Sequence, residues 1–246
     1  MPEPSSLTGN PNAALGRILA GIQERHPNVA PGPVDDAPTP DEPGHPEYHR
    51  RVRAEWALDR WHTAVPPRYR QATATLPDIQ QWADRVAADP TTAGSLLLTG
   101  TTGTGKTHQA YGALRRIAEA GPSVYEIRAT TAADMYGLLR PKGSERGAEE
   151  ELRRLARVPL LVLDDLGSAK ATEWTEEVTY RLINERYNAC RPTLYTSNLP
   201  ADSTDRQGVR QGPDLVTALG ERIVSRLSQD TTVVAMTGPD RRRGAA

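Results

Sequence analysis

The stretch Gly100-Thr101-Thr102-Gly103-Thr104-Gly105-Lys106-Thr107 decides the fold of this 246-residue chain. It satisfies the G-x-x-x-x-G-K-[ST] pattern and follows a short apolar run, 96–98, that predicts a buried strand. Helical spacing then predicts a helix from Lys106 to Ala120, closed by Gly121-Pro122. A glycine-rich loop between a strand and a helix turns backbone N–H groups and a helix N-terminus toward an anion. The stretch therefore predicts a phosphate-binding loop.

Individual residues of this loop have expected tasks toward ATP and Mg²⁺. Lys106 should reach the β- and γ-phosphates, and the Thr107 hydroxyl should ligate magnesium. The only other lysines are Lys142 and Lys170, so a lysine at this position departs from an arginine-rich composition. His108 directly follows the loop and is expected to contribute to nucleotide binding; a purely structural role is the alternative. The expected nucleotide-binding set is Gly100, Thr101, Thr102, Gly103, Thr104, Gly105, Lys106, Thr107 and His108.

Two further strand ends carry polar residues suited to hydrolysis. The run 159–163 is apolar and delivers Asp164 and Asp165 at its carboxyl end. Asp164 would hold magnesium, and Asp165 would orient and deprotonate the attacking water. A later strand ends in Thr196-Ser197-Asn198, which places Asn198 to hydrogen-bond the γ-phosphate or the water. Taken singly, these residues leave alternatives open. Asp164 and Asp165 could form an acidic turn after a buried strand, and Asn198 could be an ordinary turn residue.

Apolar strands alternate with helices from residue 93 onward, which predicts an α/β fold. Such alternation favours a P-loop NTPase core with a five-stranded parallel sheet between helices. The expected strands are 96–98, 124–127, 160–163, 193–196 and 232–236. The expected helices are 106–120, 130–140 with Thr130 or Thr131 as cap, 148–157 and 173–188, followed by helical segments within 214–227.

The chain before this core divides into two predicted segments. Residues 1–46 combine an amphipathic helix, marked by Leu15, Ile18, Leu19 and Ile22, with a proline-rich tract that we expect to be a disordered linker. Residues 47–92 form a helical segment, and 93–246 form the ATPase domain. Within the second segment we expect helices at 47–62 and 77–88, with Val52, Trp56 and Leu58 inward in the first of them. Trp56 and Trp61 are expected in the core, and base stacking by these two tryptophans is the alternative.

Composition limits the classes of function. The formal net charge of −1 excludes a globally basic nucleic-acid binder, so any DNA contact must be local or come from a ring of subunits. The single cysteine, Cys190, excludes a disulfide framework and a zinc ribbon. No apolar run approaches the roughly 20 residues of a membrane span. These features predict a soluble, cytoplasmic protein without membrane partners.

Four stretches together resemble the DnaC/IstB group of AAA+ ATPases, which are helicase loaders and transposition helpers. They are GTTGTGKTH at 100–108, LLVLDDLG at 160–167, ERYNACRPTLYTSNLP at 185–200 and LGERIVSRL at 219–227. The resemblance covers 61–243 and implies an AAA+ core with a minimal or absent C-terminal lid and a helical N-terminal extension. Asp165 stands where such proteins commonly have glutamate.

The resemblance also implies roles for single residues. Asn198 would be the sensor-1 residue, and Arg226 the arginine finger that a neighbouring subunit inserts, with Arg222 as the alternative. Arg242 would be the sensor-2 arginine, within one residue on either side. Arg140, Lys142 and Arg146 lie between the paired helices that in the related initiators and loaders contact single-stranded DNA; a solvated loop is the alternative.

The function that the resemblance implies is a helicase loader. ATP would drive self-association into oligomers on single-stranded DNA, and the N-terminal stripe would dock onto a replicative helicase. A transposition helper would instead serve a transposase. From other classes, a P-loop small-molecule kinase and a nucleotide-gated scaffold with little hydrolysis remain open.

Overall fold

A computed structural model describes residues 20–21, 24–25, 37–205 and 207–241 of the chain. The chain divides into two compact units, Met1–His45 and Pro46–Ala246. The predicted stripe of Leu15, Ile18, Leu19 and Ile22 lies outside the described residues. The second unit contains the sheet and every predicted site residue that is described.

The second unit is built on the five-stranded parallel sheet that the sequence predicts. Its strands are β1 (Ser95–Thr99), β2 (Ile127–Thr131), β3 (Leu160–Asp164), β4 (Thr193–Ser197) and β5 (Thr231–Ala235). The spatial order is β2-β3-β4-β1-β5, and all neighbours pair in parallel. Because β4 lies between β1 and β3, the carboxyl ends of these three strands share one edge of the sheet. Segments far apart in the chain therefore meet there.

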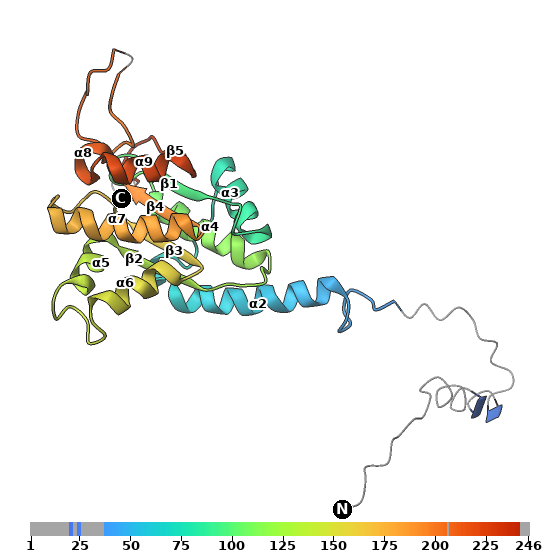
Figure 1. Cartoon of the computed structure of the whole chain (residues 1–246). Coiled ribbons are helices and arrows are strands. Elements are labelled where there is room, and N and C mark those ends of the chain that lie inside the picture. Colours follow the sequence, from blue (N-terminus) through green and yellow to red (C-terminus); the bar gives the residue numbers. More distant parts are fainter. Residues whose placement is uncertain (1–19, 22–23, 26–36, 206, 242–246) are drawn as a thin grey trace, which may run out of the picture. The chain divides into compact units, whose positions relative to one another are not determined.

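Helices cover both faces of this sheet (Figure 1). On one face lie α2 (Pro46–Ala64), the 3₁₀ turn η1 (Pro67–Tyr69), α3 (Pro77–Ala88) and α4 (Lys106–Glu119). On the other lie α5 (Ala132–Leu139), α6 (Ala148–Arg157), α7 (Glu173–Asn188), α8 (Leu215–Leu219) and α9 (Glu221–Gln229). The helical segments predicted at 214–227 are the two helices α8 and α9, separated at Gly220, whose φ is 89°. Thr131 caps α5, as expected, by accepting from the Asp134 amide.

The segment before the sheet packs into the same unit as the sheet itself. Trp61 of α2 is fully buried and its indole donates to the Tyr111 carbonyl of α4 at 3.2 Å. Trp82 of α3 is equally buried and donates to the Gly94 carbonyl at 3.1 Å, just before β1. Burial of one such side chain contributes about 2–3 kcal/mol. Both helices therefore help to hold β1 and α4, which carry the phosphate-binding loop.

The inward face predicted for α2 is wrong in part. Val52 and Trp56 are 44% and 48% exposed, whereas Ala57 and Trp61 are buried. The reason is a close backbone contact: a β-carbon added to Gly121 would lie 2.3 Å from the Arg50 carbonyl oxygen. A helix this close to a neighbouring chain segment must turn small residues toward it, so the larger side chains face outward.

The second strand begins at Ile127 rather than at Val124, so this prediction is also wrong. Val124 is 60% exposed, and Tyr125 is buried because its hydroxyl donates to the Leu114 carbonyl of α4. The strand itself is at the edge of the sheet and half-buried throughout, with Arg128 and three threonine or alanine residues. An edge strand needs no continuous apolar run, which is why the apolar signal fell on the preceding loop.

A buried arginine holds the start of β4. Arg186 of α7 is 1% exposed and donates to the carbonyls of Val158 and Pro192 at 2.7 and 2.8 Å and to the Thr193 hydroxyl at 2.7 Å. Burial lowers the pKa of its guanidinium to about 10. This value is still well above neutral pH, so the guanidinium stays charged. The arginine thereby ties the end of α6 to the first residues of β4.

Candidate functional site

The predicted phosphate-binding loop lies between β1 and α4 and depends on its glycines. Gly100, Gly103 and Gly105 have φ of 145°, 87° and 95°, in the region that favours glycine. A β-carbon on Gly100 would lie 2.1 Å from the Met236 carbonyl oxygen, and one on Gly103 would lie 1.9 Å from an Asp240 carboxylate oxygen. The segment after β5 therefore packs directly against the loop, and larger residues have no space at either position.

Lys106, the first residue of α4, is 93% buried at the centre of this loop. Its ammonium donates to the Gly100 and Thr101 carbonyls at 2.6 and 2.8 Å and to Asn198 Oδ1 at 2.9 Å. The lysine thus connects the loop after β1 with the end of β4. A buried cation among backbone dipoles is a strong attractor for phosphate oxygens.

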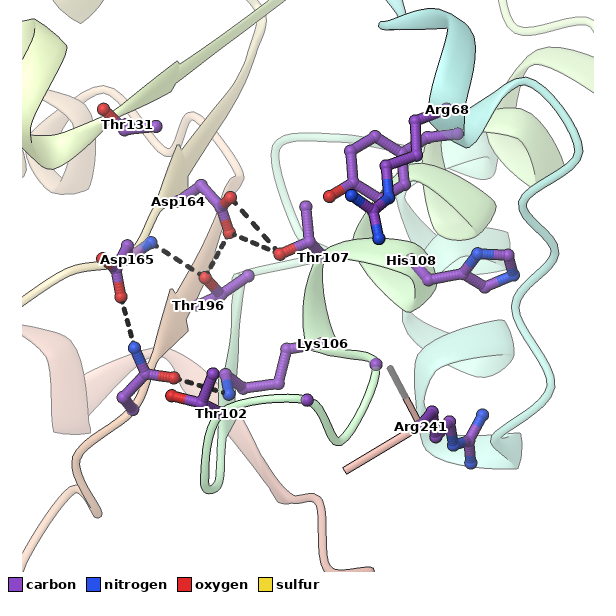
Figure 2. Close-up of a pocket in the computed structure, with 14 residues that line it drawn as sticks. Arg68, Thr102, Lys106, Thr107, His108, Thr131, Asp164, Asp165, Thr196 and Arg241 are labelled. Atoms are coloured by element: carbon purple, nitrogen blue, oxygen red, sulfur yellow. Dashed lines mark hydrogen bonds between the residues drawn. The ribbon is translucent and has the colours of Figure 1, made fainter. Parts of the chain in front are cut away.

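The two acids at the carboxyl end of β3 are connected to the loop by a chain of hydrogen bonds, drawn in Figure 2. Thr107 donates to Asp164 at 3.1 Å, and Thr196 donates to the same carboxylate. The Asp165 amide donates to the Thr196 hydroxyl at 2.9 Å, and the Asn198 amide donates to Asp165 Oδ1 at 2.6 Å. Asn198 also accepts from Lys106, so the chain runs from Thr107 through both acids to Lys106.

These residues line an open cavity of about 710 Å³. This volume lies within the range of small-molecule sites, which is roughly 300–1,000 Å³. Predicted residues at its wall are Thr102, Gly103, Gly105, Lys106, Thr107, His108, Asp164, Asp165 and Asn198. Thr104 is buried, and its hydroxyl donates to the Thr101 carbonyl within the loop. His108 is exposed, and Figure 2 shows its imidazole pointing away from the two acids.

The cavity has a wall that the motifs did not predict. Arg68 and Tyr69 come from η1, and the Tyr69 ring stacks on Tyr111 of α4 at 4.8 Å between centroids. Burial, and secondly the charge of Asp164, raise the pKa of Tyr111 to about 12, so its phenol stays neutral at neutral pH. Tyr69 therefore gives this wall of the cavity an aromatic surface, of the kind that small-molecule sites commonly have. Thr131, the last residue of β2, lines the cavity across from Arg68 and Tyr69, beyond Asp164 (Figure 2).

Two predicted arginines, Arg226 and Arg242, remain to be placed. Arg242 lies outside the described residues; its neighbour Arg241 lines the cavity, and the Arg241 amide donates to the Gly103 carbonyl at 3.0 Å. Arg226 of α9 lies in a different hollow, with its guanidinium 5.2 Å from the centre of the Tyr187 ring. Within a single chain Arg226 does not belong to the cavity, and its role stays a prediction.

The oxygen atoms of Thr107 and Asp164 suit magnesium, which prefers hard oxygen ligands. In the described part of the chain, no group of three or more His, Cys, Asp or Glu side chains could hold a metal. Magnesium at this point would therefore take its remaining ligands from phosphate and water, as is usual for it in nucleotide sites.

No helix among the described residues is long and apolar enough to cross a membrane.

The fold and site together define a class of protein. A glycine-rich loop after β1, two acids at the carboxyl end of β3 and an asparagine after β4 surround one cavity at the carboxyl edge of a parallel sheet. This is the arrangement of a nucleotide-binding P-loop protein of the AAA+ class.

Comparison with known families narrows the class. Residues 83–243, more than half of the chain, match the model of the IstB-like ATP binding proteins, and the chain belongs to this family. The uncharacterized protein YdaV of Escherichia coli is 27% identical over 74% of this chain and 71% of its own length. An insertion-sequence ATP-binding protein of Mycobacterium tuberculosis is 26% identical over 81% of this chain and 82% of its own.

Solved structures show the same fold. The DnaC helicase loader is 26% identical, with a TM-score of 0.56, over 70% of this chain and all of that chain. DnaI has a TM-score of 0.55 over 74% of this chain and all of that one, at 22% identity, which shows the fold alone. The resemblance to the DnaC/IstB group that the sequence motifs indicate is thereby confirmed.

Proposed function

We propose that this chain is an ATPase that assembles on single-stranded DNA and delivers a replicative helicase to it. The observation that carries the ATPase part is the hydrogen-bonded chain from Thr107 through both acids to Lys106. These hydrogen bonds place a phosphate-binding cation (Lys106), a carboxylate base (Asp165) and a neutral donor (Asn198) around one cavity. The likeness to the DnaC helicase loader, which covers all of the solved chain of that protein, supports the loading part.

The hydrolysis itself follows from the placement of these groups. A water oxygen attacks the γ-phosphorus of ATP, the bond to the β-phosphate oxygen breaks, and Asp165 accepts the proton of the water. Asn198 holds Asp165 at 2.6 Å and can donate to the water or the γ-phosphate in turn. Lys106 stabilises the negative charge on the phosphate oxygens. Magnesium, held by Thr107 and Asp164, would neutralise further phosphate charge when bound.

A second candidate function is that of a transposition helper, which would deliver a transposase instead. It is favoured by the insertion-sequence ATP-binding proteins of Mycobacterium tuberculosis and Bacillus thuringiensis, the latter 28% identical over 58% of this chain. Both candidates use the same ATP site and differ in the partner. The two are separated by which protein, helicase or transposase, the chain retains in a binding assay.

Contact with DNA in this proposal falls on the loop between α5 and α6. Arg140, Lys142 and Arg146 are exposed there, as expected from the sequence. Arg146 lies 3.5 Å from Glu151, a buried carboxylate that also pairs with Arg128, so the loop is held against α6 while its cations face solvent. Cations of this kind bind a phosphate backbone without regard to sequence.

Deletion of residues 1–45 should remove partner binding and leave ATP binding nearly unchanged. The cut falls before α2, whose Trp61 and Arg53 bond to Tyr111 and Gly121 within the second unit. We expect the truncated chain to keep its melting temperature and ATP affinity but to lose retention on an immobilised helicase, with immobilised transposase tested in parallel. A truncated chain that melts several degrees lower, or that still retains the partner, contradicts this assignment.

Arg226 should act on the site of a neighbouring subunit. Arg226→Ala subunits keep an intact cavity and Lys106→Ala subunits keep an intact arginine, so a mixture should regain ATPase activity that neither has alone. In an equal random mixture about a quarter of head-to-tail interfaces combine both intact parts. The measurement is steady-state phosphate release.

Two controls sharpen this mixing experiment. The double variant Lys106→Ala/Arg226→Ala, mixed with Arg226→Ala, should give no rescue. Arg222→Ala, one helical turn earlier and 4.5 Å from the centre of the Tyr180 ring, should retain activity. Cross-linking should demonstrate that mixed assemblies form. If they form and ATPase activity is still not regained, Arg226 has a structural role.

A further inference from the structure

One hydroxyl group lies between the two acids of the site. Thr196 of β4 is 1% exposed, and its hydroxyl donates to Asp164 Oδ1 while accepting from the Asp165 amide at 2.9 Å. A threonine hydroxyl carries a single hydrogen, so these two bonds fix its orientation. The hydroxyl is thereby a direct connection between the residue expected to hold magnesium and the residue expected to activate water.

The backbone around Thr196 reinforces this connection. The Thr196 carbonyl accepts from the Leu166 amide at 2.7 Å, and the neighbouring Ser197 hydroxyl donates to the Leu166 carbonyl at 2.7 Å. The turn after β3 is therefore bonded to β4 residue by residue. β4 also pairs with β1, where Thr196 lies opposite Leu98. Because β1 leads into the phosphate-binding loop, this pairing fixes the position of the turn relative to that loop.

The conformation of Asp165 explains why such anchoring is needed. Its φ of 59° is in the left-handed region, which costs most residues with a side chain about 1–2 kcal/mol and costs aspartate or asparagine less. A strained conformation persists when the surrounding bonds outweigh its cost. The bond from the Asp165 amide to Thr196 is one of these, and the strained backbone in turn directs the carboxylate toward Asn198.

We propose that Thr196 is a positioning residue for ATP hydrolysis, whose hydroxyl sets the carboxylates of Asp164 and Asp165 in one geometry. The proposal rests on the ATPase function proposed above and assigns a residue for which neither the motifs nor the resemblance gave a role. Replacement by valine keeps the shape of the side chain but leaves the Asp165 amide and the Asp164 carboxylate without this partner. Small displacements of a base from its water cost up to about 100-fold in rate.

The test compares Thr196→Val and Thr196→Ala, which lack the hydroxyl, with Thr196→Ser, which retains it. Single-turnover hydrolysis at saturating ATP should fall about 10- to 100-fold in the first two variants and stay within about 3-fold in the serine variant. ATP affinity without magnesium should be unchanged in all of them. The magnesium concentration for half-maximal rate should rise in Thr196→Val, since Asp164 loses its orienting donor.

Thr179→Val is the matched control. Thr179 is also fully buried; its hydroxyl donates to the Thr175 carbonyl and bonds to the Tyr136 hydroxyl, and none of these three residues lines the cavity. It should lose thermal stability comparably while keeping the wild-type hydrolysis rate. Native rates in Thr196→Val, equal loss in Thr196→Ser, or equal loss in Thr179→Val would overturn the positioning role. A wild-type chain without hydrolysis would overturn the proposed function together with it.

Discussion

Lys106→Ala should abolish ATP binding, with a dissociation constant at least about 100-fold higher than that of the wild-type chain. The ammonium is almost fully buried among three oxygen acceptors, so the phosphates would lose their main counter-charge in a place where water cannot replace it. Charge-assisted bonds contribute about 1.5–3 kcal/mol each, and loss of one or two of them accounts for this factor. Equilibrium binding of ATP with magnesium measures the effect.

The chain offers natural controls for this substitution. Lys142 and Lys170 are the other lysines and both are exposed, so Lys142→Ala and Lys170→Ala remove the same charge from the surface. Neither should change ATP affinity by more than about 2-fold in physiological salt, because exposed charges are screened. Native ATP affinity in Lys106→Ala would remove the basis for placing the nucleotide in this cavity.

Asp165→Asn should leave ATP binding intact and reduce hydrolysis by about 10²–10⁴-fold. Asparagine tolerates the left-handed backbone of this position and can still accept from the Asn198 amide, so the geometry is retained while the base is lost. The substitution therefore separates the proton transfer from the structure that surrounds it. Binding is measured at equilibrium and hydrolysis as phosphate release in a single turnover.

A comparison with Asp164→Asn separates the two acids. That variant should weaken binding of ATP in the presence of magnesium and leave metal-free binding nearly unchanged. The reason is that Asp164, which accepts from Thr107, is expected to hold magnesium together with that residue. Hydrolysis preserved in Asp165→Asn, or a loss of binding with turnover retained, would exclude Asp165 as the base.

Motifs that depend on local chain geometry could be predicted from the sequence. The glycines of the phosphate-binding loop follow β1, the two acids stand at the carboxyl end of β3, and Asn198 directly follows β4. Parallel strands bring their carboxyl ends to one edge, so adjacency in the chain was enough to place these residues around one cavity. Alternation of strands and helices likewise predicted the parallel sheet.

Other features depend on long-range packing that no local pattern records. The order of the strands places Thr196 between both acids, and only that order reveals its two bonds. Arg68 and Tyr69 reach the cavity because α2 packs against α4, and their own sequence context carries no periodic signal. The outward face of α2 follows from its close approach to Gly121.

Single-turnover hydrolysis of γ-labelled ATP by the full chain, with and without single-stranded DNA, tests the central claim most directly. The claim is that this cavity hydrolyses ATP in the service of an assembly on DNA. It predicts that the label is released as inorganic phosphate and that the rate rises when single-stranded DNA is added. Bound ATP that stays intact under both conditions would show a nucleotide-gated scaffold, and label transferred to a small-molecule acceptor would show a kinase; either result would contradict the claim.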